Sequence, residues 1–184
     1  MSRRLVAGFD SETTGLEYKD GHRIIEIALC IYDLDTAENI ANIAKRFNPR
    51  RAISPKAQAV HGISLDMLVA EPLFEAEAPG LAKLFRGLSL VVAHNGLGFD
   101  EPFLRNEMSV CGTPLPEVPW FDTMLEGLWA TEDGKRPSLR ELAYSLGFVY
   151  DEEKAHGALY DTQLMMECFF AARQRYGLFR TLYD

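Results

Sequence analysis

The chain has 184 residues, and its 27 acidic and 19 basic side chains give a net charge of −8. This length favours one domain, residues 1–184, with one substantial core. Hydrophobic residues at 47% and charged residues at 25% are typical of globular proteins, which excludes disordered and collagen-like chains. The acidic balance also excludes a protein that coats nucleic acid through bulk positive charge.

Cysteine usage and hydropathy indicate the compartment. Cys30, Cys111 and Cys168 are odd in number and widely spaced, so neither a disulfide framework nor a thiolate zinc site is expected. The apolar run at the N-terminus is too short for a signal peptide, and no stretch approaches the roughly 20 apolar residues of a membrane helix. We therefore expect a soluble, cytoplasmic protein with no membrane partner.

Apolar runs, periodicity and turn residues predict the secondary structure in chain order. The expected elements are strands at 5–9, 24–32 and 39–47, helices at 55–60 and 78–87, a strand at 88–94, a helix at 101–110, a strand at 120–121, and helices at 138–147 and 158–176. Three strands followed by helices that alternate with single strands predict an α/β fold, a mixed sheet flanked by helices.

Two acids stand at the end of the first predicted strand. Asp10 and Glu12 are two positions apart, so they lie on the same side of a strand. At this spacing they are about 6–7 Å apart along the chain, close enough for both to reach one cation. The alternative is a solvated acidic pair at a strand end.

Two further acids begin predicted helices. Asp161 leads a stripe of apolar residues at helical spacing, so it faces the core, where an unpaired carboxylate is costly and a metal is an obvious partner. Asp100 follows the strand predicted at 88–94, in a loop position where α/β proteins often place catalytic residues. The alternatives are a favourable charge at the helix N-terminus for Asp161 and an N-cap for Asp100.

Histidines are few in the chain. His156 precedes Asp161 by five residues and can approach it only from a loop, which Gly157 makes easy. The alternative is a histidine in a surface loop. His22 is expected to be solvated. Oxygen ligands of this kind suit Mg²⁺ or Mn²⁺, and two such ions can support phosphodiester cleavage with a histidine as general base.

Three segments resemble the motifs of the DEDDh 3′–5′ exonucleases, a DnaQ-like family. Residues 9–16 (Phe-Asp-Ser-Glu-Thr-Thr-Gly-Leu) resemble the first motif, 94–100 the second and 156–161 the third in its histidine form. Residues 53–63 are similar to the segment that precedes the second motif in the proofreading ε subunit of bacterial DNA polymerase III and in exonuclease X. The second motif is one position longer than in ε subunits, which is more like the mammalian three-prime repair exonucleases.

The resemblance implies a ribonuclease H-like fold with a five-stranded mixed sheet, and release of 5′-mononucleotides from a 3′ end. It implies that His156 deprotonates the attacking water. It also implies two Mg²⁺ or Mn²⁺ ions on four carboxylates: Asp10, Glu12, Asp100 and Asp161. The residues expected to contact the terminal nucleotide are Thr13, Thr14, Gly15, Leu16, His61 and Phe99.

DNA is the favoured substrate, and an exoribonuclease acting on RNA 3′ ends is the alternative with the same chemistry. A non-catalytic, polymerase-associated binding module is the alternative of another class. The chain ends at Asp184, about one turn after the last predicted helix, which favours a free-standing nuclease of repair or turnover over proofreading. A polymerase or repair protein stays open as a partner, and oligomeric state is not predicted. A basic cluster before His61 is a candidate contact for the strand backbone, and the alternative is a solvated loop: Lys45, Arg46, Arg50, Arg51 and Lys56.

Overall fold

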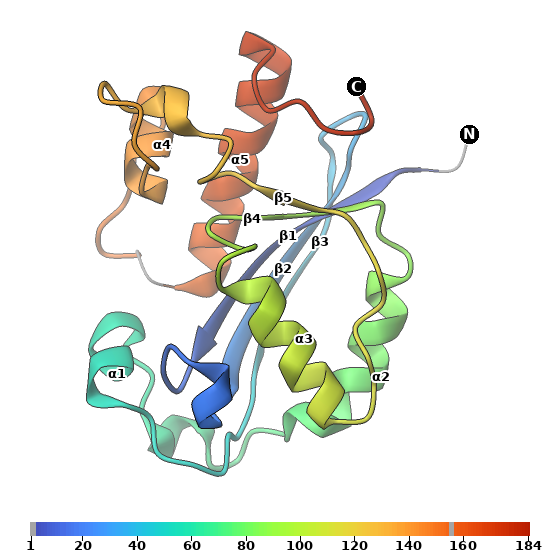
Figure 1. Ribbon diagram of the computed structural model, residues 1–184, viewed down its shortest axis with the longest axis vertical. Coiled ribbons are helices and arrows are strands. Elements are labelled where there is room, and N and C mark those ends of the chain that lie inside the picture. The colour runs from blue at the N-terminus through green and yellow to red at the C-terminus, as the bar shows by residue number, and fades with distance from the viewer. Residues whose placement is uncertain (1–2, 155–156) are drawn as a thin grey trace.

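The structure is a computed structural model that describes residues 3–154 and 157–184. Its centre is a five-stranded sheet with the order β3-β2-β1-β4-β5 (Figure 1). The strands are β1 (Leu5–Thr13), β2 (Ile24–Asp33), β3 (Asn39–Arg46), β4 (Leu90–Ala93) and β5 (Trp120–Asp122). The β1–β2 and β2–β3 pairs are antiparallel, whereas β1–β4 and β4–β5 are parallel. The predicted mixed sheet is therefore confirmed.

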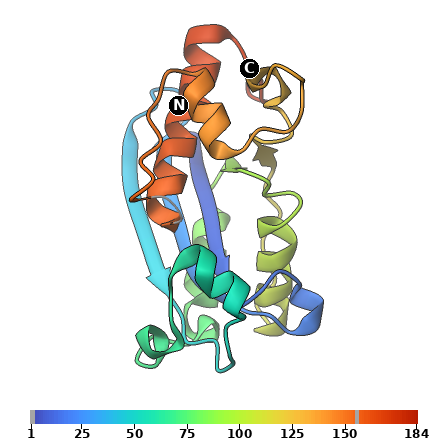
Figure 2. The same ribbon diagram turned by 90° about the vertical axis from the view of Figure 1, so that its left-hand side faces the viewer.

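Helices cover both faces of this sheet (Figures 1 and 2). They are α1 (Pro55–His61), α2 (Phe74–Phe85), α3 (Asp100–Val110), α4 (Leu139–Ser145) and α5 (Ala158–Tyr176). Buried side chains of α2 and α3 form one core with one face of the sheet, and those of α4 and α5 form a second core on the other face. The sheet is thus buried on both sides.

The first strand shows how the sequence divides these two cores. Ala7 and Phe9 point into the core with α2 and α3, whereas Val6 points into the core with α5. Gly8 lies on the α5 side, where α5 comes so close that a Cβ atom at this position would lie 2.5 Å from the Cγ of Met166. Residues of β1 that alternate with Phe9 therefore face α5.

Several boundaries differ from the prediction. β1 extends to Thr13 because its polar end continues the hydrogen-bonded ladder with β2, which a search for apolar runs cannot detect. α2 begins at Phe74, four residues before the predicted start, because Phe74 belongs to the buried stripe of that helix although Pro79 interrupts its backbone hydrogen bonds. Short 3₁₀ turns at 18–20, 65–68 and 128–130 were not predicted.

Other boundaries agree closely. α5 has the predicted bounds and ends at Gly177 in a left-handed conformation. α1 begins after Ser54, whose side chain accepts a hydrogen bond from the Ala57 amide (3.1 Å), and ends at Gly62.

In the described part of the chain, no helix is both long and apolar enough to cross a membrane.

Candidate active site

The four predicted acids come from three segments that meet at one edge of the sheet. Asp10 and Glu12 lie in the last half of β1, and Asp100 is the first residue of α3, shortly after β4. Since β1 and β4 are parallel neighbours, the chain leaves both at the same edge. Asp161 lies in the first turn of α5, which packs on the β1 face that carries Asp10 and Glu12 (Figure 1).

The electrostatics of these acids shows that they act on one another. Burial and then the negative charge of Asp161 raise the pKa of Asp10 to about 7. Burial raises the pKa of Glu12 to about 9, with further contributions from the charges of Asp10 and Asp100. A group of carboxylates that disfavours its own ionisation in this way gains strongly from a cation.

Asp100 is the most deeply buried of the four predicted metal ligands, with 3% of its surface exposed. Burial, followed by the charge of Asp10, raises its pKa well above the usual value. Its Oδ1 accepts a hydrogen bond of 2.6 Å from the Ser11 hydroxyl, which ties the start of α3 to the end of β1. His156, the remaining predicted catalytic residue, lies outside the described residues.

A cavity of about 470 Å³ opens beside Glu12. Its walls come from the loop after β1 and from α1. These two segments are joined by a 2.8 Å hydrogen bond from the Ser54 amide to the Thr14 carbonyl. Leu16 is 76% exposed at this cavity. Five of the six predicted nucleotide contacts line it: Thr13, Gly15, Leu16, His61 and Phe99. This volume is that of a small-molecule site.

Thr14 is the predicted contact that does not line the cavity. It is fully buried, and its hydroxyl oxygen accepts a hydrogen bond from the Arg23 amide (3.0 Å) and pairs with Nδ1 of His22 at 2.9 Å. His22 lines the cavity and lies so close to Gly15 that a Cβ atom there would be 2.3 Å from its ring. The expectation that His22 is merely solvated is therefore wrong. Its ring contacts Thr14 and Gly15 in the preceding turn, and these contacts form only in the folded chain.

His61, at the end of α1, lines this cavity. Its Nδ1 accepts a 3.0 Å hydrogen bond from the Ile63 amide, which leaves the proton of the neutral ring on Nε2. Nε2 is buried and makes no hydrogen bond of ordinary geometry, but the Thr13 main chain lies near enough to the ring to raise its pKa, against the effect of burial. Burial lowers the pKa of His61, which favours the neutral ring.

Two acids near the site were not predicted from the sequence. Glu26 of β2 stands directly opposite Glu12 in the ladder, and its charge contributes to the raised pKa of Glu12. Asp122, at the end of β5, accepts hydrogen bonds from the amides of Asn95 and Leu97 in the loop before Asp100. Only strand pairing could have revealed these two acids, because both are distant in sequence from the motifs.

Ion pairs separate the predicted basic cluster into two residues that bind acids on the sheet and α2, and two that lie at the cavity. Lys45 pairs with Glu77, and Arg46 pairs with Glu26 through Nε at 2.7 Å, so both charges are largely neutralised. Arg51 donates to the Asp20 carbonyl at 3.2 Å, beside the cavity, and Lys56 lines the cavity itself.

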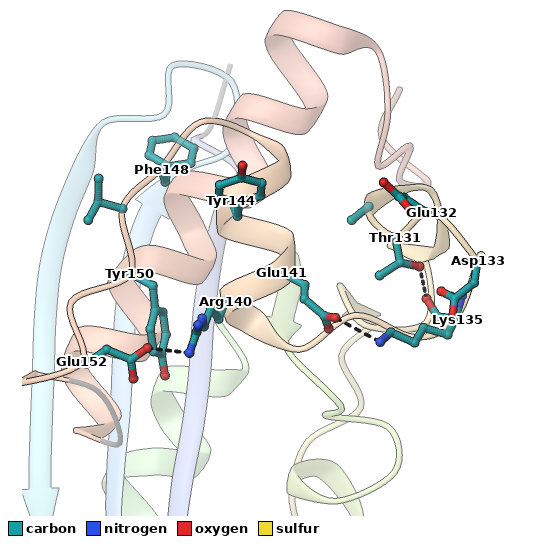
Figure 3. A pocket seen from close by; sticks show the side chains of 12 residues that line it. Thr131, Glu132, Asp133, Lys135, Arg140, Glu141, Tyr144, Phe148, Tyr150 and Glu152 are labelled. Carbon is teal, nitrogen blue, oxygen red and sulfur yellow. Dashed lines mark hydrogen bonds and ion pairs between the residues drawn. The ribbon is translucent and has the colours of Figure 1, made fainter.

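A second hollow, of about 830 Å³, lies over α4 (Figure 3). Arg140 and Glu152 form an ion pair across it at 2.6 Å, and Lys135 pairs with Glu141 at 3.1 Å. None of the four predicted metal ligands is among its described lining residues. Of the four predicted metal ligands, Glu12 lines the smaller cavity.

Comparisons with known proteins give consistent results. A family model described as Exonuclease (RNase_T) matches residues 7–169. The DNA polymerase III subunit epsilon of Escherichia coli is 31% identical over 179 residues, covering 93% of this chain and 71% of that protein. The 3′–5′ exonuclease DinG of Bacillus subtilis is 32% identical over 124 residues, covering 67% of this chain and 13% of that protein.

Among solved structures, exonuclease I of E. coli in complex with single-stranded DNA matches with a TM-score of 0.81 at 17% identity. The match covers 96% of this chain, which spans only 42% of the exonuclease I chain. At this identity the likeness shows the fold alone, and it confirms the predicted ribonuclease H-like fold.

Proposed function

Since the chain belongs to the Exonuclease (RNase_T) family and is a DnaQ-like 3′–5′ exonuclease, we propose that it releases 5′-mononucleotides from the 3′ ends of DNA by two-metal hydrolysis. Residues 1–184 act in this proposal as one exonuclease domain. The observation that supports it most strongly is the meeting of four carboxylates at one edge of the sheet. The pKa values of Asp10, Glu12 and Asp100 are raised there, and Glu12 lines a cavity of about 470 Å³.

The donor set fits hard divalent cations. Four carboxylates would hold two Mg²⁺ or Mn²⁺ ions: Asp10, Glu12, Asp100 and Asp161. When bound, such ions activate the attacking water and stabilise the leaving oxygen. In the described part of the chain, no three His, Cys, Asp or Glu side chains already form a set that could hold a metal ion. Binding therefore has to draw these side chains together, which rotations about side-chain bonds permit.

The cavity is suited to the terminal nucleotide. Exposed Leu16 and half-buried Phe99 offer apolar surface to a base, and Phe99 is supported by the ring of Phe103 at 5.5 Å. The His61 ring lines the same cavity and can contact the sugar of the terminal nucleotide. Because Gly15 has no side chain, the His22 ring can pack against the turn that contacts the nucleotide in this proposal. These residues bind and orient the strand end.

His156 is assigned the general-base role in this proposal, by its place in the third motif. It would accept the proton of the attacking water, a contribution of about 10²–10⁴-fold to the rate. The partner is a nucleic acid 3′ end, as single-stranded DNA is for exonuclease I. The similarity to DNA polymerase III epsilon subunits makes a DNA polymerase the first protein partner to test.

End-labelled DNA and RNA oligonucleotides, incubated with and without Mg²⁺, test this function. We expect a ladder of products shortened from the 3′ end, faster on DNA, and none in a chelator. Asp10→Asn and His156→Ala should each lower the rate at least about 100-fold, while Asp66→Asn, a change at an exposed acid, should not. Full activity of Asp10→Asn would contradict the mechanism. Chelator-insensitive binding without release would indicate the non-catalytic module instead.

A further inference from the structure

Asp122 is a buried acid with an unusual number of backbone partners. It ends β5, is 3% exposed, and accepts four hydrogen bonds from main-chain amides. Two come from its own turn: Met124 (3.0 Å) and Leu125 (3.2 Å), both to Oδ1. The other two come from the loop after β4: Asn95 to Oδ1 and Leu97 to Oδ2, each at 3.0 Å.

That loop connects β4 directly to Asp100. Asn95 has a positive φ of 66°, which is strained for most residues, and its carbonyl accepts the amides of Gly98 (3.1 Å) and Phe99 (3.0 Å). The Glu101 amide then donates to the Gly96 carbonyl at 2.8 Å. The path from β4 to α3 is therefore one compact turn, and its conformation determines where Asp100 stands.

Neighbours of Asp122 hold the start of the same loop. The Thr123 amide donates to the Ala93 carbonyl at 2.9 Å, and the Thr123 hydroxyl oxygen lies 2.9 Å from Nδ1 of His94. Nε2 of His94 lies 3.1 Å from the Pro137 carbonyl oxygen. The end of β5 thus fixes the loop at four successive points, and the Asp122 carboxylate supplies the two that lie nearest to Asp100 in the sequence.

We propose that Asp122 is a positioning residue for the exonuclease reaction: its carboxylate fixes the 94–99 loop and so places the Asp100 carboxylate for metal binding. This inference rests on the proposed role of Asp100 as a metal ligand. In this proposal, Asp122 contacts neither the metal ions nor the substrate. Residues that orient metal ligands typically contribute about 10- to 100-fold to metal affinity or activity.

The two carboxylate oxygens allow a selective test. In Asp122→Asn, the side-chain oxygen can keep the three donors on the Oδ1 side, and the new NH₂ group then faces the Leu97 amide, donor against donor. The substitution therefore breaks the contact with Leu97, the loop contact nearer to Asp100 in the sequence, and preserves the Asn95 contact and the turn after β5.

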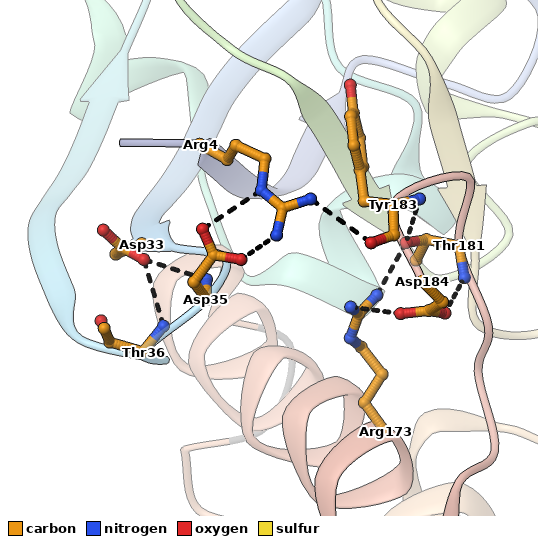
Figure 4. Close-up of polar contacts among 8 residues, drawn as sticks. All are labelled: Arg4, Asp33, Asp35, Thr36, Arg173, Thr181, Tyr183 and Asp184. Carbon is orange, nitrogen blue, oxygen red and sulfur yellow. Dashed lines mark hydrogen bonds and ion pairs between the residues drawn. The ribbon is translucent and has the colours of Figure 1, made fainter. Parts of the chain in front are cut away.

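Asp33 provides a matched control. It ends β2, is 5% exposed, and its Oδ1 accepts the amides of Asp35 (2.9 Å) and Thr36 (3.1 Å) in the hairpin to β3 (Figure 4). The hairpin lies at the opposite end of β1 from Asp10 and Glu12, because Asp33 pairs with Leu5. Asp33→Asn thus perturbs a similar buried carboxylate far from the site.

The experiment measures Mg²⁺ affinity by calorimetry in the absence of substrate, and kcat and KM on a single-stranded DNA oligonucleotide. For Asp122→Asn we expect Mg²⁺ affinity to fall about 10- to 100-fold, kcat to fall with it at fixed Mg²⁺, and KM for DNA to stay near wild type. Asp33→Asn should match the wild type in all three. Wild-type behaviour of Asp122→Asn, or an equal loss in both variants, would overturn the inference.

Hydrogen exchange of the unaltered protein keeps the test open if Asp122→Asn does not fold. The Leu97 amide should be protected, and Mg²⁺ should slow its exchange further, because coupling between loop and metal is reciprocal. Exchange that is fast, or that Mg²⁺ does not change, would overturn the inference. Asp100→Asn distinguishes failure of the proposed function from failure of the role of Asp122. If Asp100→Asn keeps Mg²⁺ affinity and activity, the proposed function fails. If Asp100→Asn loses both while Asp122→Asn keeps them, only the role of Asp122 fails.

Discussion

The close approach of α5 to β1 at Gly8 gives a quantitative prediction for both stability and activity. A Cβ atom added at Gly8 would lie 2.5 Å and 2.9 Å from Cγ and Sδ of Met166, and 2.9 Å from Cγ2 of Thr162. Ordinary contacts begin near 3.4 Å, so Thr162 must retreat by roughly half an ångström and Met166 by nearly one. Met166 can partly rotate away, but Thr162 is held by its 2.6 Å hydrogen bond to the Ala158 carbonyl.

Gly8→Ala should therefore push the first turns of α5 away from the sheet. Overpacking of this kind costs about 1–3 kcal/mol in the free energy of unfolding. Because Thr162 follows Asp161, the same displacement moves a proposed metal ligand away from Asp10. A misplacement approaching 1 Å can cost up to about 100-fold in rate, so we expect kcat to fall by about 10- to 100-fold.

Urea unfolding and the oligonucleotide assay measure these two effects. Gly80→Ala is the matched control, since a Cβ atom in this position of α2 meets nothing within 4 Å. That variant should gain about 0.4–1 kcal/mol, because alanine favours the helix and restricts the unfolded chain. If Gly8→Ala proved as stable and as fast as the wild type, the packing of α5 on β1 would not set the geometry of the site.

Two further predictions concern buried charge. The raised pKa values of Asp10 (about 7) and Glu12 (about 9) mean that the folded protein binds protons that the unfolded chain releases. In EDTA, its free energy of unfolding should therefore fall as the pH rises from about 4 to about 9, and a flat or rising urea profile would contradict this. Arg23→Ala should cost about 3–5 kcal/mol, because Glu107, 1% exposed and bonded to Arg23 Nε at 2.6 Å, would lose its partner. Arg140→Ala, at an exposed ion pair, should cost less than about 1 kcal/mol by the same measurement.

The sequence was sufficient for the parts of the fold that depend on local pattern. The alternation of β1 placed Asp10 and Glu12 on one face, and the apolar stripe of α5 placed Asp161 on the buried side of its helix. The order of strands and helices predicted a mixed sheet, which the structure has. These features depend on residues a few positions apart, whose relation is set by the geometry of a strand or a helix.

Tertiary structure alone decided which distant residues became partners. Strand register placed Glu26 opposite Glu12, and sheet order placed Asp122 of β5 against the loop that leads to Asp100. The basic cluster of the sequence lost two of its charges to ion pairs, with Glu26 and with Glu77 of α2. The residues in these pairs are 14 or more positions apart, so local spacing does not restrict their distance. Only the pairing of strands and the packing of helices on the sheet set these distances. The distances in turn determine which side chains surround the site.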